Sequence, residues 1–235
     1  MPIFRLSNRL EFPPAWLARS DGLLCIGGDL SAQRLLLAYE NGIFPWFSKD
    51  EPILWWSPDP RLILFPKNIR ISKSLKKKIK KPTYTVTMDT AFEQTILSCA
   101  RPRKDEYAGT WLVDEMVASY INLHTLGYAH SIETWRDNQL VGGLYGVCLG
   151  KTFFGESMFS FDSDASKIAL VALSTHLQSQ NFDLIDCQVT TNHLLSMGAT
   201  EVSRNFFLEL IFESVKKKED INTWNPNTTL KINYT

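Results

Sequence analysis

The spacing of apolar residues predicts helices near the start of the chain and throughout its second half. The stretch SAQRLLLAYENG begins at Ser31, a favourable N-cap residue, and ends at Gly42, a residue that commonly terminates helices. Thr90 and Glu93 have the spacing of a capping box, and Asp164 stands where the cap of a long helix is expected. Apolar periodicity predicts further helices at 90–100, 112–127, 165–180, 192–198 and 203–218.

Strand patterns occupy the region between the second and third of these later helices. YAHSIETW, QLVGGLYGVCLG and KTFFGESMF predict an antiparallel meander whose first turn is Asp137 and Asn138, and DLIDCQ predicts another strand. The resulting order is helix, helix, three strands, helix, strand, helix. This order predicts an α+β protein with an N-acetyltransferase-like (GNAT-like) domain, built on a mixed, mainly antiparallel sheet.

Composition divides the chain into three parts. Residues 1–65 are rich in Pro and Trp and predict a small irregular N-terminal lobe. Residues 66–82 form a basic connecting segment, because 67–81 hold eight basic side chains and no acid. Residues 83–235 are evenly mixed and form the predicted catalytic domain.

The overall composition excludes several classes of protein. With 44% hydrophobic residues and a formal net charge of zero, the 235-residue chain is expected to be globular, with any nucleic-acid contact confined to a local patch. The sequence has no apolar run long enough to span a membrane and no signal peptide, which favours the cytoplasm. Four scattered cysteines without a CxxC pair, and histidines without an HExxH motif, predict no metal site.

Two predicted buried strands carry polar residues where Val or Ile would be usual. Glu156 lies in the last strand of the meander, and Asp186 and Gln188 end the following strand. Because Asp186 and Gln188 are two residues apart, strand alternation should direct them to the same face. The three side chains predict a catalytic site; the alternative is a buried polar network without function.

The expected donor-binding loop of an acetyltransferase is missing. A glycine-rich loop before the long helix would offer N–H groups to a pyrophosphate. The segment FSFDSDASK stands there instead, and its Asp162 and Asp164 would repel phosphate. We therefore expect the acyl donor to be something other than coenzyme A, and we predict no cofactor.

Many separate motifs together resemble one family. GGDLS, GIFPWF, WWSPDPR, GTWL, AHSIETW, LVGGLYG, FFGESMFS, DASKIAL and DCQ stand in the order and approximate spacing of leucyl/phenylalanyl-tRNA-protein transferases. The resemblance implies transfer of Leu, Phe or Met from aminoacyl-tRNA to proteins with N-terminal Arg or Lys, which marks them for degradation. It implies a cytoplasmic enzyme with tRNA and protein as partners, which we expect to be a monomer.

The resemblance also suggests roles for individual residues. Gln188 would orient the attacking amine, Asp186 would attract it or act as its base, and Glu156 would bind the α-amino group of the donor. Strand alternation and the resemblance together suggest an aminoacyl pocket of Phe153, Met158, Ser160, Leu144, Trp111, Trp46 and Tyr39. Candidate contacts to tRNA phosphates are Lys73, Lys76, Lys77, Lys78, Lys80, Lys81 and Arg61.

Other interpretations stay open from the sequence. The pocket residues are of types that usually form a core, and the lysine run is also typical of a solvated helix face. A small-molecule N-acyltransferase would share the fold but should have the pyrophosphate loop. A noncatalytic RNA-binding protein would keep the lysines without needing Glu156, Asp186 and Gln188.

Overall fold

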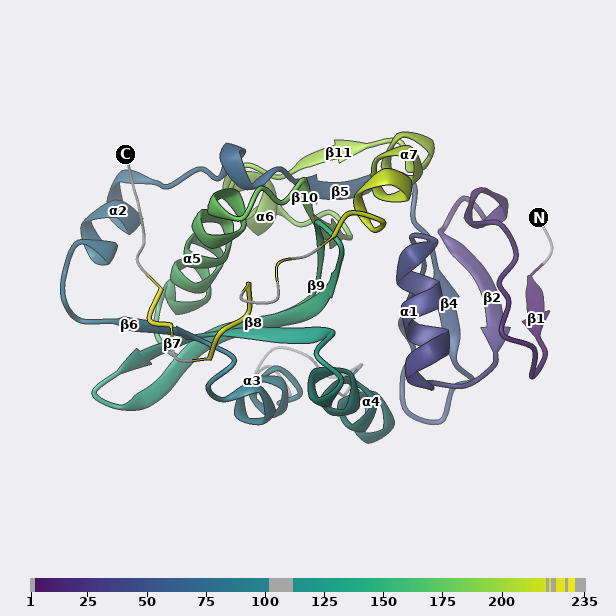
Figure 1. Cartoon of the computed structure of the whole chain (residues 1–235), viewed down its shortest axis with the longest axis horizontal. Coiled ribbons are helices and arrows are strands. Elements are labelled where there is room, and N and C mark those ends of the chain that lie inside the picture. The colour runs from purple at the N-terminus through teal and green to yellow at the C-terminus, as the bar shows by residue number, and fades with distance from the viewer. Residues whose placement is uncertain (1–2, 102–111, 219, 221–222, 227, 231–235) are drawn as a thin grey trace.

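The computed structural model describes residues 3–101, 112–218, 220, 223–226 and 228–230, and contains two sheets (Figure 1). The smaller sheet has the strand order β1-β2-β4-β3 and forms an N-terminal lobe with one α-helix. Its elements are β1 (Phe4–Leu6), η1 (Ala15–Leu17, a 3-10 turn), β2 (Leu23–Gly27), α1 (Ala32–Glu40), β3 (Phe44–Pro45) and β4 (Leu54–Trp56). The predicted start of α1 is confirmed, because the Ser31 side chain accepts a hydrogen bond from the backbone N–H of Arg34.

The larger sheet has the strand order β11-β5-β10-β9-β8-β7-β6. Within it β9 and β10 run parallel, and the other neighbouring pairs are antiparallel. The α+β class, the meander and the mainly antiparallel sheet are therefore confirmed. The strands are β5 (Arg61–Leu64), β6 (Thr85–Met88), β7 (Ala129–Arg136), β8 (Gln139–Leu149), β9 (Thr152–Ser160), β10 (Leu184–Gln188) and β11 (Thr200–Val202).

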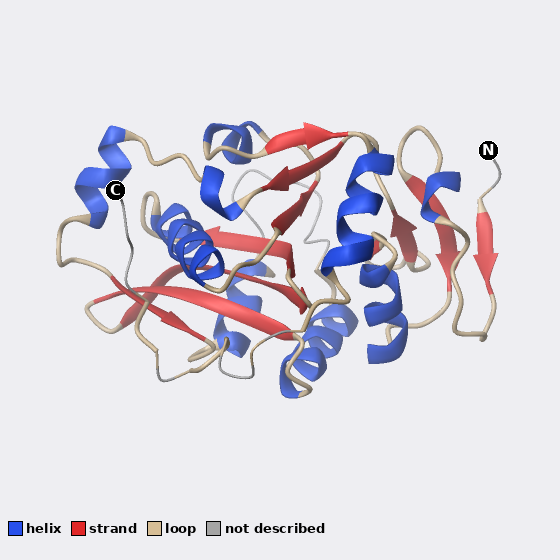
Figure 2. Ribbon diagram, turned by 45° about the horizontal axis from the view of Figure 1, so that its top comes forward, coloured by secondary structure: helices blue, strands red, loops and turns tan. Residues whose placement is uncertain are grey.

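Helices cover both faces of the larger sheet (Figure 2). One face packs against α5, with Ile168 and Leu173 among the buried residues of that core. The opposite face packs against α3 and α4, where Ile96 and Tyr120 are buried. The remaining elements and bounds are η2 (Pro66–Asn68), α2 (Lys73–Ile79), α3 (Phe92–Cys99), α4 (Asp114–Thr125), α5 (Ala165–Ser179), α6 (Asn192–Ser196) and α7 (Arg204–Ser214).

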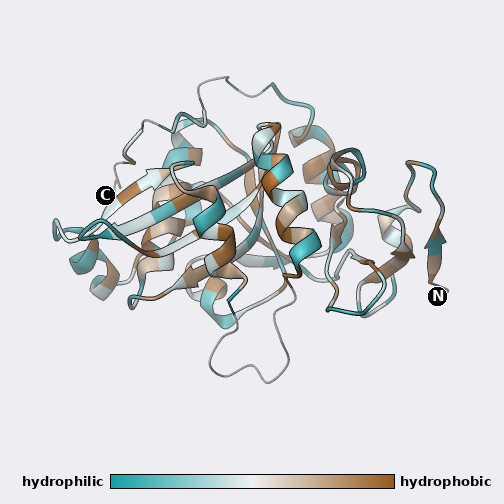
Figure 3. Ribbon diagram, turned by 90° about the horizontal axis from the view of Figure 1, so that it is seen from below, coloured by the Kyte–Doolittle hydropathy of each residue, from teal (hydrophilic) through white to brown (hydrophobic). Residues whose placement is uncertain are grey.

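Strand alternation explains how one sheet serves two cores. Leu144 and Phe153 belong to the core under α5, whereas their neighbours Tyr145 and Phe154 belong to the core on the other face. Figure 3 shows the corresponding mixture of hydrophobic and hydrophilic positions along the helices. In the part of the chain that the structure describes, none of the helices has the length and hydropathy needed to cross a membrane.

Two details differ from the sequence-based expectations, whereas the boundary of the N-terminal lobe at residue 65 stays a prediction. Strand β5, which ends just before that position, pairs within the larger sheet. The predicted capping box is wrong, because α3 begins after Ala91 and the Thr90 hydroxyl donates to the carbonyl of Met88. Asp164 does precede α5, but its side chain makes no capping hydrogen bond.

Candidate active site

A cavity of about 1110 Å³ opens beside the two parallel strands β9 and β10. Their pairing runs from Leu184 opposite Thr152 to Asp186 opposite Phe154. Beyond this point each strand carries an irregularity, and residues of both strands line the cavity. The polar residues predicted from the two strand ends therefore lie at one site.

A β-bulge in β9 positions Glu156. Tyr145 of β8 pairs with Ser157 and the next residue, Gly146, pairs with Gly155, which leaves Glu156 as the extra residue of β9. A bulge changes the direction of the side chains that follow it. This explains how Phe153 and Met158, five positions apart, both line the cavity.

Gly146 is required opposite this bulge. A Cβ atom placed on Gly146 would lie 2.2 Å from the carbonyl oxygen of Phe154 and 2.6 Å from the Phe153 ring. The first contact is to backbone and cannot be relieved by a side-chain rotation. The close approach of β8 to β9 therefore depends on this glycine.

A second bulge, in β10, positions Gln188. The register with β5 shifts between Asp186 and Gln188, and Gln188 has a positive φ of 61°. The expectation that simple alternation aligns the two side chains is therefore incorrect for this strand. They are connected instead through the backbone, since the N–H of Gln188 donates to Oδ1 of Asp186 at 2.9 Å.

Hydrogen bonds join the two bulges. Nε2 of Gln188 donates to Oε1 of Glu156 at 2.7 Å, and the hydroxyl of Tyr120 donates to Oε2 at 2.7 Å. The Tyr39 hydroxyl lies 2.6 Å from that of Tyr120. Each oxygen of Glu156 thus has a defined partner, and the carboxylate is fixed in one orientation at the cavity wall. Tyr120 was not predicted, because an apolar-patterned helix gives no sign that its phenol reaches a carboxylate.

The environment of Glu156 raises the pKa of its carboxyl to about 7. Burial is the main cause and the charge of Asp186 adds to it, whereas hydrogen bonds from Tyr120, Tyr39 and Gln188 act in the opposite direction. A carboxyl with this pKa changes its charge near neutral pH. It can therefore pair with an ammonium group or accept a proton during a reaction.

The raised pKa predicts a pH-dependent stability difference. Glu156 contributes stability that is fully present below its ordinary pKa of 4.5 and is lost as pH rises through about 7. The Glu156→Gln variant lacks this loss, so at pH 8 its free energy of unfolding should exceed that of the wild type by about 2–3 kcal/mol. Urea unfolding at pH 5 and pH 8 measures the difference, which should shrink at pH 5. The exposed Glu93→Gln is the control, and a pH-independent difference would contradict the assignment.

Asp186 forms a buried ion pair with Arg61. The guanidinium donates from Nε to Oδ1 at 2.8 Å and from Nη2 to Oδ2 at 2.6 Å. The two side chains are 1% and 0% exposed. The prediction that Arg61 contacts tRNA phosphates is therefore corrected, since a buried and paired guanidinium cannot reach a phosphate on the surface.

The apolar wall of the cavity holds most of the predicted pocket. Leu144, Phe153, Met158, Ser160 and Trp46 line it. Tyr39 lies behind Glu156 rather than on the wall, and Trp111 lies outside the described residues. Leu173 of α5 also lines the cavity, together with Leu170 of α5 and Ile185 of β10. Leu170 and Ile185 were not predicted, because helix periodicity and a buried strand pattern mark them only as core positions.

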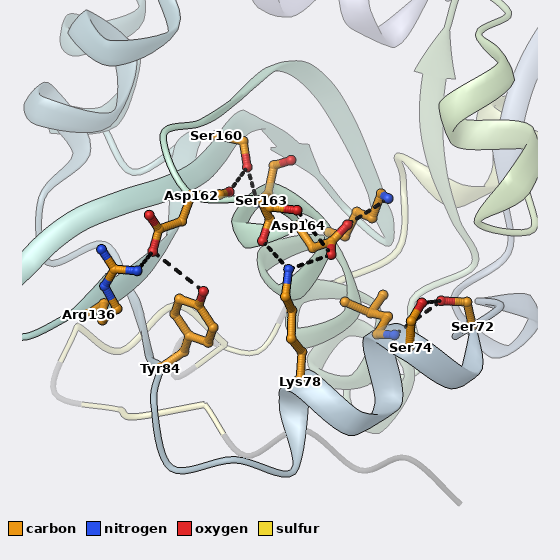
Figure 4. Close-up of polar contacts among 12 residues, drawn as sticks. Ser72, Ser74, Lys78, Tyr84, Arg136, Ser160, Asp162, Ser163 and Asp164 are labelled. Atoms are coloured by element: carbon orange, nitrogen blue, oxygen red, sulfur yellow. Dashed lines mark hydrogen bonds and ion pairs between the residues drawn. The ribbon is translucent and has the colours of Figure 1, made fainter.

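The basic connecting segment contains helix α2, which lies at the surface near the start of α5 (Figure 1). Lys73, Lys77, Lys80 and Lys81 are exposed, and Lys76 is partly buried. Lys78 forms intramolecular hydrogen bonds, because its Nζ donates to the carbonyl of Ser163 and to Oδ2 of Asp164, both at 2.7 Å (Figure 4).

The segment before α5 is arranged around acidic side chains. Asp164 also pairs with Lys167 at 2.8 Å, and these two lysines lower the pKa of Asp164 to about 2. Asp162 pairs with Arg136 (Figure 4). In the segment that would bind pyrophosphate in an acetyltransferase, both carboxylates are thus paired with cations of this protein, and the expectation that they repel phosphate stays a prediction.

One cluster in the described residues has side chains of metal-binding types. Asp89, His124 and His130 place possible ligand atoms within 4.8 Å of one another. Nδ1 of His130 bonds to Asp89 at 2.6 Å, and Nδ1 of His124 bonds to the carbonyl of Ala129 at 2.7 Å. None of the three residues lines the cavity, so the cluster is separate from the site.

A cavity beside the two parallel strands β9 and β10, with a carboxylate and an amide held on its wall, is the arrangement expected of an enzyme active site. Comparison of the sequence with models of known protein families identifies the family. The model of the leucyl/phenylalanyl-tRNA protein transferase family matches residues 63–212, and the model of that family's N-terminal domain matches residues 28–59. The chain belongs to the leucyl/phenylalanyl-tRNA protein transferase family and is an aminoacyltransferase.

Relatives named leucyl/phenylalanyl-tRNA–protein transferase match almost the whole chain. The protein of Desulforapulum autotrophicum is 58% identical over 95% of this chain and 98% of its own length. That of Syntrophobacter fumaroxidans is 55% identical over 95% and 96%. The match therefore includes both the N-terminal lobe and the larger sheet.

Two solved structures match the chain at low similarity. L-PGS from Bacillus licheniformis has a TM-score of 0.39 at 9% identity and covers 72% of this chain and 53% of its own. A GCN5-related N-acetyltransferase from Kribbella flavida has a TM-score of 0.34 at 8% identity, covering 72% and 60%. The description of the fold accordingly rests on the strand order itself.

Proposed function

We propose that this protein transfers Leu, Phe and Met from aminoacyl-tRNA to the N-terminal Arg or Lys of acceptor proteins. It acts in the cytoplasm as a monomer, needs no cofactor, and creates a degradation signal. The observation that carries the proposal is the cavity, which combines an apolar wall with the hydrogen-bonded Glu156 and Gln188. An apolar wall suits the uncharged side chain of the donor amino acid. Glu156 and Gln188 suit the two amino groups of the reaction, one on the donor and one on the acceptor protein.

The reaction forms a peptide bond by aminolysis of an ester. The attacking α-amine has a pKa near 8 in solution and must be neutral to react. In the proposed arrangement Glu156 binds the α-amino group of the donor, and Gln188 orients the attacking amine against the ester carbonyl. The nitrogen of the neutral amine bonds to the carbonyl carbon, the acyl–oxygen bond breaks, and the proton that the amine loses passes to the ribose oxygen, so that the tRNA leaves with a free hydroxyl. Because an aminoacyl ester already reacts with amines, positioning can supply much of the rate.

The donor side chain would occupy the apolar wall. Phe153 and Leu144 are almost fully buried, and Met158 is partly buried beside them. A methionine can adjust its shape at low energetic cost, which suits a pocket that accepts both Leu and Phe. Trp46, which is 42% exposed and also lines the cavity, would contact the donor nearer the opening.

Phosphates of the donor tRNA would contact the exposed lysines of α2 and its end. Contacts of this type carry no sequence information, so the enzyme would accept different tRNAs and select at the amino acid. Lys78 would act indirectly, by holding α2 against the start of α5.

Replacing Lys73, Lys77 and Lys81 together by Gln should weaken aminoacyl-tRNA binding and flatten its salt dependence. Each lost phosphate contact lowers the slope of log K against log[salt] by about 0.7–0.9, so three contacts correspond to about 2–3 units. Filter binding between 50 and 300 mM salt measures the slope. A variant with Lys49, Lys216 and Lys218 replaced removes the same charge elsewhere and should keep the wild-type slope. Equal slopes in all three proteins would instead support a solvated helix face.

The proposed activity is tested by incubating the protein with radiolabelled Leu-tRNA and an acceptor protein that begins with Arg. Label should appear at the acceptor's N-terminus, and an otherwise identical acceptor beginning with Glu should stay unlabelled. Absence of transfer to the Arg acceptor would refute the proposal. Acyl-CoA binding in calorimetry would favour a small-molecule acyltransferase, and tRNA binding unaccompanied by transfer would favour a noncatalytic RNA-binding protein.

A further inference from the structure

Arg61 is held more rigidly than the ion pair alone requires. Its guanidinium carbon lies 4.9 Å from the ring centroid of Phe44 and 4.4 Å from that of Phe207. These aromatic rings fix the guanidinium plane, and the two bonds to Asp186 fix its rotation within that plane. All this is buried, with Arg61 1% exposed. Asp186 is thereby held in one orientation.

The orientation of Asp186 is transmitted to Gln188. Oδ1 of Asp186 accepts one hydrogen bond from Nε of Arg61 and another from the backbone N–H of Gln188. That backbone N–H belongs to the residue at positive φ, a conformation that costs energy outside glycine and needs support. The Gln188 amide then reaches Glu156. A continuous chain of hydrogen bonds therefore runs from Arg61 to the cavity wall.

The geometry points to Arg61 as a positioning residue, which acts through Asp186 to set the backbone of Gln188 and so the place of its amide in the cavity. This inference rests on the proposed transfer reaction. Asp186 is then a fixed anion: Oδ1 already accepts two hydrogen bonds and Oδ2 accepts one from Nη2 of Arg61. It contributes by holding Gln188 rather than by taking the proton of the attacking amine.

Arg61→Lys tests the role of the planar, two-pronged contact, since lysine keeps the charge but cannot reproduce both bonds. We expect kcat to fall about 100-fold, as for an ångström-scale misplacement of a reacting group, with the donor tRNA Kd within about threefold. A loss of tRNA affinity as large as the loss of kcat would show a role in donor binding and would overturn the inference.

The matched control is Arg34→Lys. Arg34 is also 1% exposed and pairs through Nε with a carboxylate, that of Asp29 at 3.0 Å, but it lies in the N-terminal lobe. Both variants should lose stability, and only Arg61→Lys should lose kcat. Equal loss of kcat in the two variants would show a general structural effect and overturn the inference.

A double-variant cycle separates action through Asp186 from independent action. If Arg61 acts only through Asp186, the Arg61→Lys/Asp186→Asn protein should be about as slow as Asp186→Asn alone. If the losses of rate in the two single variants multiply in the double variant, the inference is contradicted.

Hydrogen exchange of the Gln188 side-chain amide, followed by NMR, is a readout independent of activity. The exchange should be faster in Arg61→Lys than in the wild type, and unchanged in Arg34→Lys. Unchanged exchange would refute the positioning role even if the wild type proved to have no transfer activity, and a lack of wild-type transfer would refute the proposed function alone.

Discussion

Gln188→Ala is expected to reduce the rate of aminoacyl transfer about 100-fold or more, with little change in the affinity for the donor tRNA. The amide of Gln188 lies at the cavity wall and bonds to Glu156, so its loss removes a group proposed to orient the attacking amine and frees the carboxylate. Misorientation of a reacting group by about 1 Å can cost about 100-fold in rate. Asp186→Ala should act in the same direction, because it removes the anion that holds the Gln188 backbone and leaves Arg61 buried without its partner.

Single-turnover measurements with saturating Leu-tRNA give the rate, and filter binding gives the tRNA Kd. Gln178→Ala is a suitable control, because Gln178 is an exposed glutamine on α5 that does not line this cavity. Its rate should equal that of the wild type. A loss of tRNA affinity as large as the loss of rate would show that Gln188 serves donor binding and would contradict the proposed role.

The donor pocket should favour Leu, Phe and Met over Ile and Val by about 100-fold. The side chains of Leu and Ile contain the same number of carbon atoms, so hydrophobicity alone would treat them almost alike. The expected difference is steric: a second substituent on Cβ would press on the cavity wall, which includes the closely packed side chain of Phe153. Charged donor side chains should be rejected more strongly, since they would lose hydration without gaining a partner.

Competition between Leu and Ile attached to the same tRNA body measures this selectivity at the amino acid alone. Mass spectrometry of the acceptor's N-terminus gives the ratio of the two products. A Phe153→Ala variant should reduce the ratio, because it opens the wall that the branched side chain would strike. Comparable transfer of Leu and Ile by the wild type would show that the pocket does not read branching at Cβ.

Much of the local structure followed from the sequence because it depends on short-range interactions. The helix beginning at Ser31, the end of α4 near Gly127 and the turn at Asp137 and Asn138 all involve residues whose backbone preferences act within a few positions. Apolar periodicity then assigned the long helix α5 and its neighbouring strands. The misplaced start of α3 at Thr90 shows the limit of such reasoning, since a matching spacing does not ensure that the capping bond forms.

The site was harder to predict because long-range contacts build it. The sequence singled out Glu156, Asp186 and Gln188 as polar residues in apolar strands, and the structure brings them together. It offered no means of finding the two bulges, which depend on how β8 and β5 pair with these strands. The partner of Asp186 is 125 positions away in sequence, so Arg61 could be assigned only by its charge, and it was assigned to the wrong surroundings.

The sequence by itself determined the class of fold, the family and the residue types at the candidate site, because apolar periodicity and long motifs are properties of neighbouring positions. Tertiary structure alone decided which charged side chains are accessible to a partner such as tRNA. Lys78 and Arg61 were both predicted from their charge to contact tRNA, yet one is bound to Asp164 and the other is buried against Asp186. The charge of a side chain can be read from its letter, whereas its burial and its partner depend on the packing of distant segments.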